Sequence, residues 1–242
     1  MMAPVVTSSC NNKPLHTPPL RTVIHVRVGK HKPGDHCSEL AHAIAVDLVA
    51  RVLDRPAYGL GVMHAFPARR PVVSGLRSDE CCAISVSHAA GFAAVAASAR
   101  IAPVGIDVVR IADATSSLDW CICEKELPLG VRQDAFFRRA SVWAAKEAAF
   151  KASVVDAPFR PRRVSIKPRS ERSFAWCRLT EVGWERGAGV WFSGDDHVVA
   201  VAAHGLREWD EITIVDHRRV SSMTSEGFLG EGIDASEVKH CW

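Results

Sequence analysis

The sequence contains no apolar run of the roughly 18–20 residues that a helix needs to cross a bilayer. Residues 1–20 also lack the basic start and the continuous apolar core of a secretory signal peptide. We therefore expect no membrane partner. The Pro, Ser, Thr and Asn content of residues 1–20 favours a flexible N-terminal arm.

Zinc-binding and nucleic-acid-binding patterns are scarce as well. The eight cysteines include no repeated C-x-x-C pair, so zinc is disfavoured and a reduced, cytoplasmic protein is the simplest interpretation. The chain has a single tyrosine and no continuous basic run, which argues against a nucleic-acid partner.

The formal net charge of +3 hides an uneven distribution. Residues 1–100 carry 11 Lys and Arg against 6 Asp and Glu, whereas residues 206–242 carry 4 against 8. A basic front half can attract a phosphate-bearing ligand or an acidic partner protein. A solvated surface with an ordinary mixture of charges accounts for the same composition.

Hydrophobic periodicity predicts a mixed α+β chain. Residues 21–29 alternate as a strand, and apolar residues at i, i+4 spacing predict a helix over about 37–54 with Ser38 as its cap. Residues 81–98 read as two buried strands joined by a turn. A further strand carries Asp107, and a second long helix is expected over about 133–155. The remaining strands are expected at "RVSIKP", "FAWCRLT", "GVWFSGDDHVVAVAAH" and "EITIV".

Two segments resemble one another. "SHAAGFAAVAAS" (87–98) and "DDHVVAVAAH" (195–204) each place a His before an Ala/Val strand and follow a long amphipathic helix. This repeat suggests two related α+β halves with a ligand cleft between them. The boundaries that we expect are an arm at 1–20, halves at 21–104 and 105–215, and a polar, acidic tail at 216–242.

The second long helix contains "WAAKEAAFKA" (143–152), in which Glu147 falls on a largely apolar stripe. A carboxylate among inward-facing residues needs a partner, because unpaired burial costs several kcal/mol. Lys151, one turn later, can be that partner. An ordinary solvent-exposed i, i+4 pair of Glu147 with Lys151 explains this stretch equally well.

A second carboxylate favours the buried interpretation of Glu147 over the exposed pair. Asp107 lies within the apolar strand "VGIDVVRI" (104–111), where an unpaired carboxylate is rare. Two inward carboxylates favour a hard divalent cation, most naturally Mg²⁺ with water and substrate phosphate oxygens as further ligands. Lys146 and Lys151 beside such a cation suit phosphoryl-transfer chemistry.

A third polar group lies at the corner "SVSHAAG" (85–91), which contains Ser87 and His88. Hydroxyl and imidazole groups next to an accessible backbone suit a phosphate, although a lone histidine is more often structural. Arg69 and Arg70 precede this corner and are surface charges by default.

Taken together, "SVSHAAG", "VGIDVVRI" and "WAAKEAAFKA" resemble, in order and spacing, the motifs of the 4′-phosphopantetheinyl transferases of the surfactin-synthetase-activating type. The segment "CICEKEL" (121–127) resembles a degraded form of another motif of that family, with Glu126 as its acid. The resemblance extends over about residues 20–205.

The resemblance implies two pseudo-twofold-related halves with coenzyme A in the cleft between them. It also implies transfer of the phosphopantetheine arm to a serine of an acyl or peptidyl carrier protein, with release of 3′,5′-ADP. By carry-over, Asp107 and Glu147 hold Mg²⁺, Glu147 deprotonates the serine, and Lys151 assists the departing phosphate. The implied phosphate contacts come from Lys146 and from Ser87 and His88 with Arg69 or Arg70.

One position departs from the family pattern. Val109 stands where many members of this type carry a third acidic ligand, so a water or another group must replace it. A catalytically silent protein that binds coenzyme A or the carrier is therefore an alternative, as is a coincidence of motifs in a plain α+β domain. The two-half length favours polyketide or nonribosomal-peptide carriers and a monomer.

Overall fold

The computed structural model describes residues 22–30, 37–65, 70–99, 103–128, 134–154, 157–206 and 212–216. Arg69, one of the expected phosphate contacts, lies outside these residues, as do the N-terminal arm and the acidic tail. No helix in the described ranges is both long enough and apolar enough to span a membrane.

The N-terminal half is built on a sheet with one long helix. Its elements are β1 (Thr22–Lys30), α1 (Cys37–Val52), β2 (Gly61–Ala65), β3 (Arg70–Ser74), β4 (Ala83–Ala89) and β5 (Phe92–Ser98). The main sheet has the order β11-β1-β5-β4, and β2 and β3 form a separate hairpin.

The C-terminal half has a five-stranded sheet in the order β6-β10-β9-β8-β7. Its long elements are β6 (Val104–Arg110), α2 (Ala135–Ala152), β7 (Val164–Pro168), β8 (Ser173–Thr180), β9 (Gly183–Ser193), β10 (His197–His204) and β11 (Ile212–Asp216). Its 3₁₀ turns are η1 (Ile111–Asp113), η2 (Ser116–Cys121), η3 (Glu124–Glu126) and η4 (Pro161–Arg163).

The two halves repeat one topology. In each half a strand leads to a long helix and later to an antiparallel hairpin whose second strand pairs back with the first, giving β1-β5-β4 and β6-β10-β9. The expected α+β class with two related halves is confirmed. The repeat is incomplete, because β11, expected in the C-terminal half, pairs in parallel with β1 of the other sheet.

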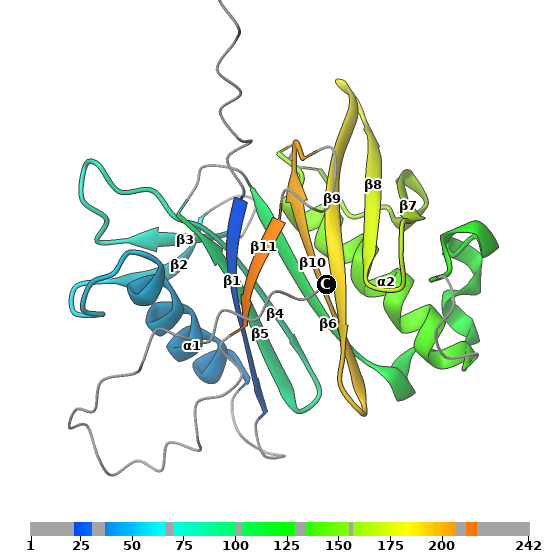
Figure 1. Ribbon diagram of the computed structural model, residues 1–242, viewed down its shortest axis with the longest axis horizontal. Coiled ribbons are helices and arrows are strands. Elements are labelled where there is room, and N and C mark those ends of the chain that lie inside the picture. Colours follow the sequence, from blue (N-terminus) through cyan, green and yellow to red (C-terminus); the bar gives the residue numbers. More distant parts are fainter. Residues whose placement is uncertain are drawn as a thin grey trace, which may run out of the picture.

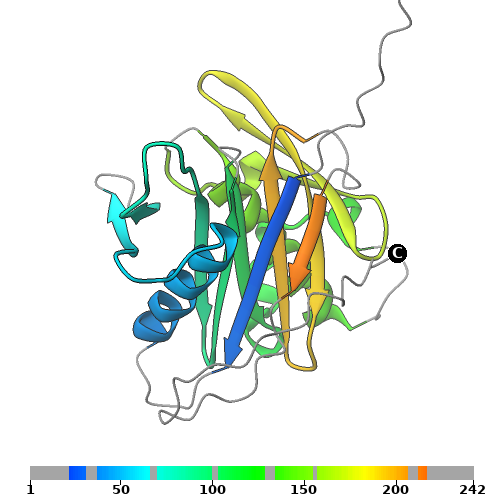
Figure 2. The ribbon, with the colours of Figure 1, turned by 60° about the vertical axis from the view of Figure 1, so that its left-hand side comes forward.

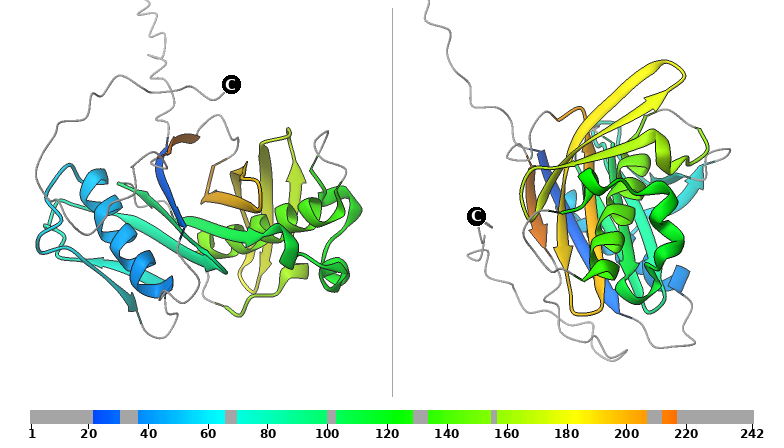
Figure 3. Two further views of the ribbon diagram at one scale, coloured as in Figure 1. Left: turned by 90° about the horizontal axis from the view of Figure 1, so that it is seen from below. Right: turned by 90° about the vertical axis from the view of Figure 1, so that its right-hand side faces the viewer.

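The layers place the two helices on the outside (Figure 1). The α1 helix packs through Leu48 on one face of the first sheet, and α2 packs through Ala149 on one face of the second. Side chains from both sheets, including Val26 and Ile106, form a further cluster between them. The view in Figure 2 shows α1 in front of its strands, and the view from below in Figure 3 separates the two helices clearly.

The two helices begin and end for local reasons. Asp134 caps α2, since its side chain accepts a hydrogen bond from the backbone NH of Phe136. The α1 helix begins at Cys37, so Ser38 lies inside the helix and is not its cap as expected. The α2 helix ends at Ala152, before the expected end at about residue 155, and Val154 is exposed.

Candidate active site

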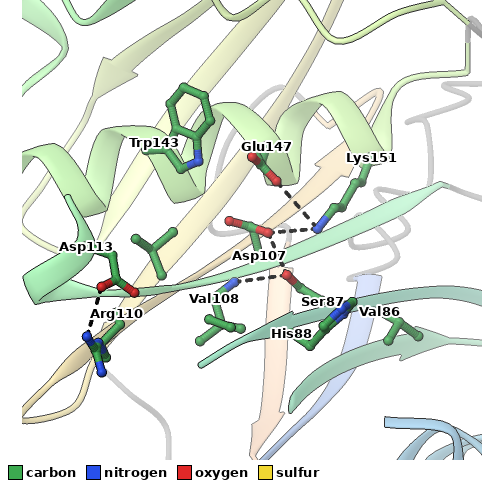
Figure 4. Close-up of a pocket in the computed structure, with 12 residues that line it drawn as sticks. Val86, Ser87, His88, Asp107, Val108, Arg110, Asp113, Trp143, Glu147 and Lys151 are labelled. Carbon is green, nitrogen blue, oxygen red and sulfur yellow. Dashed lines mark hydrogen bonds and ion pairs between the residues drawn. The ribbon is translucent and has the colours of Figure 1, made fainter. Parts of the chain in front are cut away.

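A cavity of about 440 Å³ lies where the ends of β4 and β6 meet one face of α2 (Figure 4). Most of the residues singled out in the sequence line it together: Ser87, His88, Asp107, Trp143, Glu147 and Lys151. They come from both halves of the chain, because β4 belongs to the first sheet and β6 and α2 to the second. We call this cavity the acidic groove.

The close approach of β6 to α2 sets the geometry of the groove. Gly105 permits this approach, because a Cβ atom at that position would lie 1.9 Å from the carbonyl oxygen of Ala148. Ala148 and Ala152 of the helix are fully buried against the strand. The alanines of "WAAKEAAFKA" are therefore explained by packing, and Asp107 is brought to the helix.

Asp107 is almost fully buried, at 3% exposure, and its carboxylate is partnered from two sides. The Ser87 hydroxyl donates to Asp107 Oδ1 at 2.6 Å, and Lys151 Nζ lies 2.7 Å from the same oxygen. Lys151 Nζ also donates to the carbonyl oxygen of Ile106 at 3.1 Å. A buried carboxylate with these partners is held in one orientation, facing the groove.

Serines of β4 also accept hydrogen bonds from the backbone NH groups at the outer edge of β6. The backbone NH of Ile106 donates to Ser85 Oγ at 3.1 Å, and that of Val108 donates to Ser87 Oγ at 3.4 Å. Both strands are edges of their sheets, so these hydroxyls take the place of a neighbouring strand. Ser87 thus joins the two halves at Asp107.

Glu147 lies one helical turn before Lys151, and the shortest distance between their charged atoms is 3.9 Å. Burial, followed by the nearby negative charge of Asp107, raises the pKa of the Glu147 carboxyl to about 7, while Lys151 and Trp143 act in the opposite direction. A carboxyl group with this pKa can accept a proton at neutral pH and release it again. The exposed-pair interpretation of Glu147 and Lys151 does not describe this environment.

His88 lines the acidic groove and its side chain is exposed, so the imidazole is accessible to a ligand. Arg70 does not line the groove. Its Nη1 atom donates to the carbonyl oxygen of Ser153 at 2.6 Å, just beyond the last turn of α2. In this position Arg70 ties the N-terminal half to the end of α2.

Lys146 is not in the acidic groove, in contrast to the expected phosphate contact. It is 2% exposed, and its ammonium group donates to Glu126 Oε1 at 2.8 Å and to the carbonyl oxygens of Val164 and Pro161 at 2.6 and 3.2 Å. All three donors of the ammonium group are used by the protein, so none is left for a phosphate. Lys146 instead anchors α2 to η3, η4 and β7.

Val109 lines the groove, and one further acid that sequence reasoning did not single out lines it too. Asp113 belongs to η1 and accepts a hydrogen bond from Arg110 Nη2 at 3.0 Å. The family pattern directs attention to the position two residues after Asp107, whereas Asp113 lies six residues after it. The η1 turn places it at the same cavity.

The oxygen donors of the groove fit a hard divalent cation in their chemistry. Asp107 and Glu147 are the residues that could hold it, since they face one another across Lys151 (Figure 4). Among the described residues, no group of three or more His, Cys, Asp or Glu side chains has the geometry of a metal site. Mg²⁺ is compatible with this arrangement, because it commonly keeps several waters and is bound through one or two carboxylates and substrate phosphates.

Residues 103–202 match the model of the 4′-phosphopantetheinyl transferase superfamily. The matched segment contains both carboxylates of the groove and Lys151, whereas Ser87 and His88 lie before it. No curated protein matches the chain. The match supports a transferase of this general kind, and the geometry shows which side chains of the matched segment meet.

Proposed function

We propose that the protein transfers the 4′-phosphopantetheine arm of coenzyme A to a serine hydroxyl of an apo acyl or peptidyl carrier protein, and that it releases 3′,5′-ADP. The observation that carries this proposal is the meeting of Asp107, Glu147 and Lys151 in one groove within the segment that matches the superfamily. We place the protein in the surfactin-synthetase-activating type, acting as a cytoplasmic monomer on polyketide or nonribosomal-peptide carriers.

The reaction is a phosphoryl transfer with a simple balance of bonds. The serine oxygen forms a bond to the β-phosphorus of coenzyme A, and the bond from that phosphorus to the bridging oxygen breaks. The electron pair stays with 3′,5′-ADP, and the proton of the serine hydroxyl goes to Glu147. The raised pKa of Glu147 suits this role, because a base titrating near neutrality is efficient at neutral pH.

Lys151 is suited to the leaving group. Its ammonium group already contacts a buried carboxylate at 2.7 Å and can turn to the oxygens of the departing phosphate. When bound by Asp107 and Glu147, Mg²⁺ supplies neutralisation of the pyrophosphate charge. His88 is accessible at the rim of the groove, where we assign it to the 3′-phosphate together with Arg69. Arg70 joins that contact only if it releases the Ser153 carbonyl.

The direct test is a mass measurement on the acceptor. The protein is incubated with coenzyme A, Mg²⁺ and an apo carrier protein, and the carrier is weighed by mass spectrometry with and without a chelator. We expect the carrier to gain one phosphopantetheine group, and the gain to disappear with the chelator. Unchanged carrier masses across several acyl and peptidyl carriers would contradict the proposal.

Val109 favours a second candidate function, a catalytically silent protein that binds coenzyme A or the carrier. An apolar side chain at this position removes a possible ligand for the cation. Titration calorimetry with coenzyme A separates the candidates, because the silent protein binds without producing 3′,5′-ADP. Appearance of 3′,5′-ADP in the presence of the carrier rules it out.

A further inference from the structure

A strongly basic segment lies outside the acidic groove. Residues 160–172 contain six cationic side chains against one acid, Glu171, and all six cations are exposed: Arg160, Arg162, Arg163, Lys167, Arg169 and Arg172. The segment is not a continuous run, because η4 and the alternation of β7 separate the charges.

These cations differ from the cations of the N-terminal half. There, Arg27 and Arg51 share Asp47, and Arg55 and Arg77 share Glu80. By contrast, no acidic side chain among the described residues pairs with any of the six cations of residues 160–172. Concentrated positive charge without internal compensation attracts an acidic partner.

Protection of a sheet edge explains only part of this charge. The β7 strand is the outermost strand of its sheet, and edge strands commonly carry lysine to prevent association with other sheets. Lys167 fits that role, since Val164 and Ile166 are buried and Lys167 points away from them. Arg160, Arg162 and Arg163 precede the strand in and around η4, so edge protection does not account for them.

One of these arginines is held in place by an exposed aromatic residue. Arg162 lies over the ring of Trp120, 5.3 Å from its centroid, and its Nε atom donates to the Trp120 carbonyl oxygen at 2.8 Å. Trp120 is 56% exposed. Tryptophan and arginine are the residue types most enriched at the energetic centres of protein interfaces. An arginine that is already ordered also loses less entropy when a partner binds.

The basic segment begins next to a residue that contacts the lining of the acidic groove. Phe159, directly before Arg160, packs edge-on against Trp143 with 5.6 Å between ring centroids, and Trp143 lines the groove. The contact of Phe159 with Trp143 therefore places the start of the basic segment near the groove. We name the surface formed by Trp120, Arg160, Arg162 and Arg163 the η4 surface.

We propose that the η4 surface docks an acidic face of the carrier protein and thereby presents the acceptor serine to the groove. This inference rests on the proposed function, since that function supplies a protein partner. Charge complementarity on such a surface mainly raises the rate of association, and salt screens it.

The test uses the full chain with Arg160, Arg162 and Arg163 replaced together by Ser. Initial rates are measured with an apo acyl carrier protein at low and high salt. We expect the KM for the carrier to rise about tenfold at low salt with kcat nearly unchanged, and the difference to shrink at high salt. The rise in melting temperature on adding coenzyme A should be unaltered, which shows that the fold and the groove are intact.

Matched single variants provide the control. Arg163→Ser removes an unpaired cation of the η4 surface, whereas Arg77→Ser removes a cation that is 72% exposed in the other half. We expect the KM for the carrier to rise only for Arg163→Ser. Equal effects of the two variants, or an unchanged KM in the triple variant, would overturn the proposal.

Docking on the η4 surface can be tested even if the protein does not transfer phosphopantetheine. Titration calorimetry of the protein with the apo carrier then tests docking alone, and loss of binding in the triple variant supports the η4 surface while the proposed reaction fails. A 20-base-pair DNA duplex is titrated in parallel. Binding to the duplex as tight as binding to the carrier would assign the surface to polyanions in general and overturn the proposal.

Discussion

Two cavities among the described residues differ in how their carboxylates are placed: Asp107 and Glu147 face one another in the acidic groove, whereas Asp195 and Asp196 of the second cavity are neighbours in one turn. The second cavity, of about 360 Å³, lies between the end of β1 and the turn that joins β9 to β10. Asp107 faces Ala200, three residues before the end pair Arg110–His197. Three residues before the equivalent end pair Lys30–Phe92, Arg27 faces Val95. An arginine paired with Asp47 of α1 therefore stands in the N-terminal half where the aspartate stands in the C-terminal half.

The two helices also differ in the side chains that they contribute to the cavities. The α2 helix contributes Trp143, Glu147 and Lys151 to the acidic groove, whereas α1 contributes no lining residue to the second cavity. The second cavity does contain charges, since Asp196 pairs with Lys30 and His197, but these come from strand ends and a turn. The side chains of β6 and α2 therefore make the acidic groove chemically different from the second cavity.

The largest expected effect comes from removing one carboxylate of the acidic groove. Glu147→Gln should reduce phosphopantetheine transfer at least about a thousandfold, because it removes the base and one oxygen ligand of the cation. The rate of carrier modification measures this loss. Asp196→Asn, in the second cavity, is the matched control and should change the rate less than about twofold. Equal losses in the two variants would remove the distinction between the grooves.

The next largest effect concerns the buried charge that anchors α2, which has no parallel among the described buried side chains of α1. The buried positions of α1 are all apolar, whereas α2 buries Lys146 on Glu126. Lys146→Met should lower the free energy of unfolding by about 3–5 kcal/mol, because it leaves Glu126 buried without a counter-charge. Urea denaturation measures this change.

A second variant separates anchoring from ligand contact. Adding Glu126→Gln to Lys146→Met should restore part of the lost stability, since no uncompensated charge then remains. In the folded single variant, the affinity for coenzyme A measured by calorimetry should be unchanged. A clear loss of affinity would place Lys146 in ligand binding after all.

A smaller effect links the acidic groove to pH. The pKa of Glu147 in the folded protein, about 7, is raised above the ordinary value of 4.5. Its ionised form is therefore disfavoured by folding, and stability is lost as the pH rises from about 4.5 to 7. Glu147→Gln removes this cost, so it should stabilise the ligand-free protein by up to about 3 kcal/mol at pH 8 and by almost nothing at pH 4.

Differential scanning calorimetry measures the pH effect. The gain corresponds to an increase in melting temperature of several degrees at pH 8 for a chain of this length. Asp196→Asn should show no such gain, because the pKa of Asp196 is lowered, chiefly by the His197 hydrogen bond. A melting-temperature difference that is equal at both pH values would contradict this account of Glu147.

The smallest effect concerns competition for the carboxylates. Lys151 Nζ occupies the space between Asp107 and Glu147, so a divalent cation must displace it. Lys151→Met should therefore strengthen Mn²⁺ binding about tenfold in the absence of coenzyme A, while it weakens phosphopantetheine transfer. Calorimetry with Mn²⁺ measures the first effect, and weaker Mn²⁺ binding in the variant would contradict it.

Local patterns were sufficient to predict much of the fold. The helix expected over 37–54 is observed as Cys37–Val52, and that over 133–155 as Ala135–Ala152. The pairing of β11 with β1 could not be predicted, because parallel pairing between distant segments leaves no local period. The β2–β3 hairpin was hidden by the proline and glycine content around it.

The candidate site was predictable where motif and periodicity agreed. Asp107, Glu147 and Lys151 were singled out in the sequence and meet in the groove. Lys146 was assigned to the same site as Glu147. Adjacent residues on a helix point about 100° apart, so helix geometry alone could have indicated that the two side chains diverge. Its partners, Glu126 and the carbonyl groups of Pro161 and Val164, come from distant segments that no local pattern connects.

The account depends most on one divalent cation shared by Asp107 and Glu147. Crystals grown with coenzyme A and Mn²⁺ allow the metal to be located by its anomalous scattering. We predict a single strong peak within bonding distance of both carboxylates, with Lys151 displaced toward the pyrophosphate. A peak beside Asp195 and Asp196 in the second cavity, or none between Asp107 and Glu147, would contradict the account.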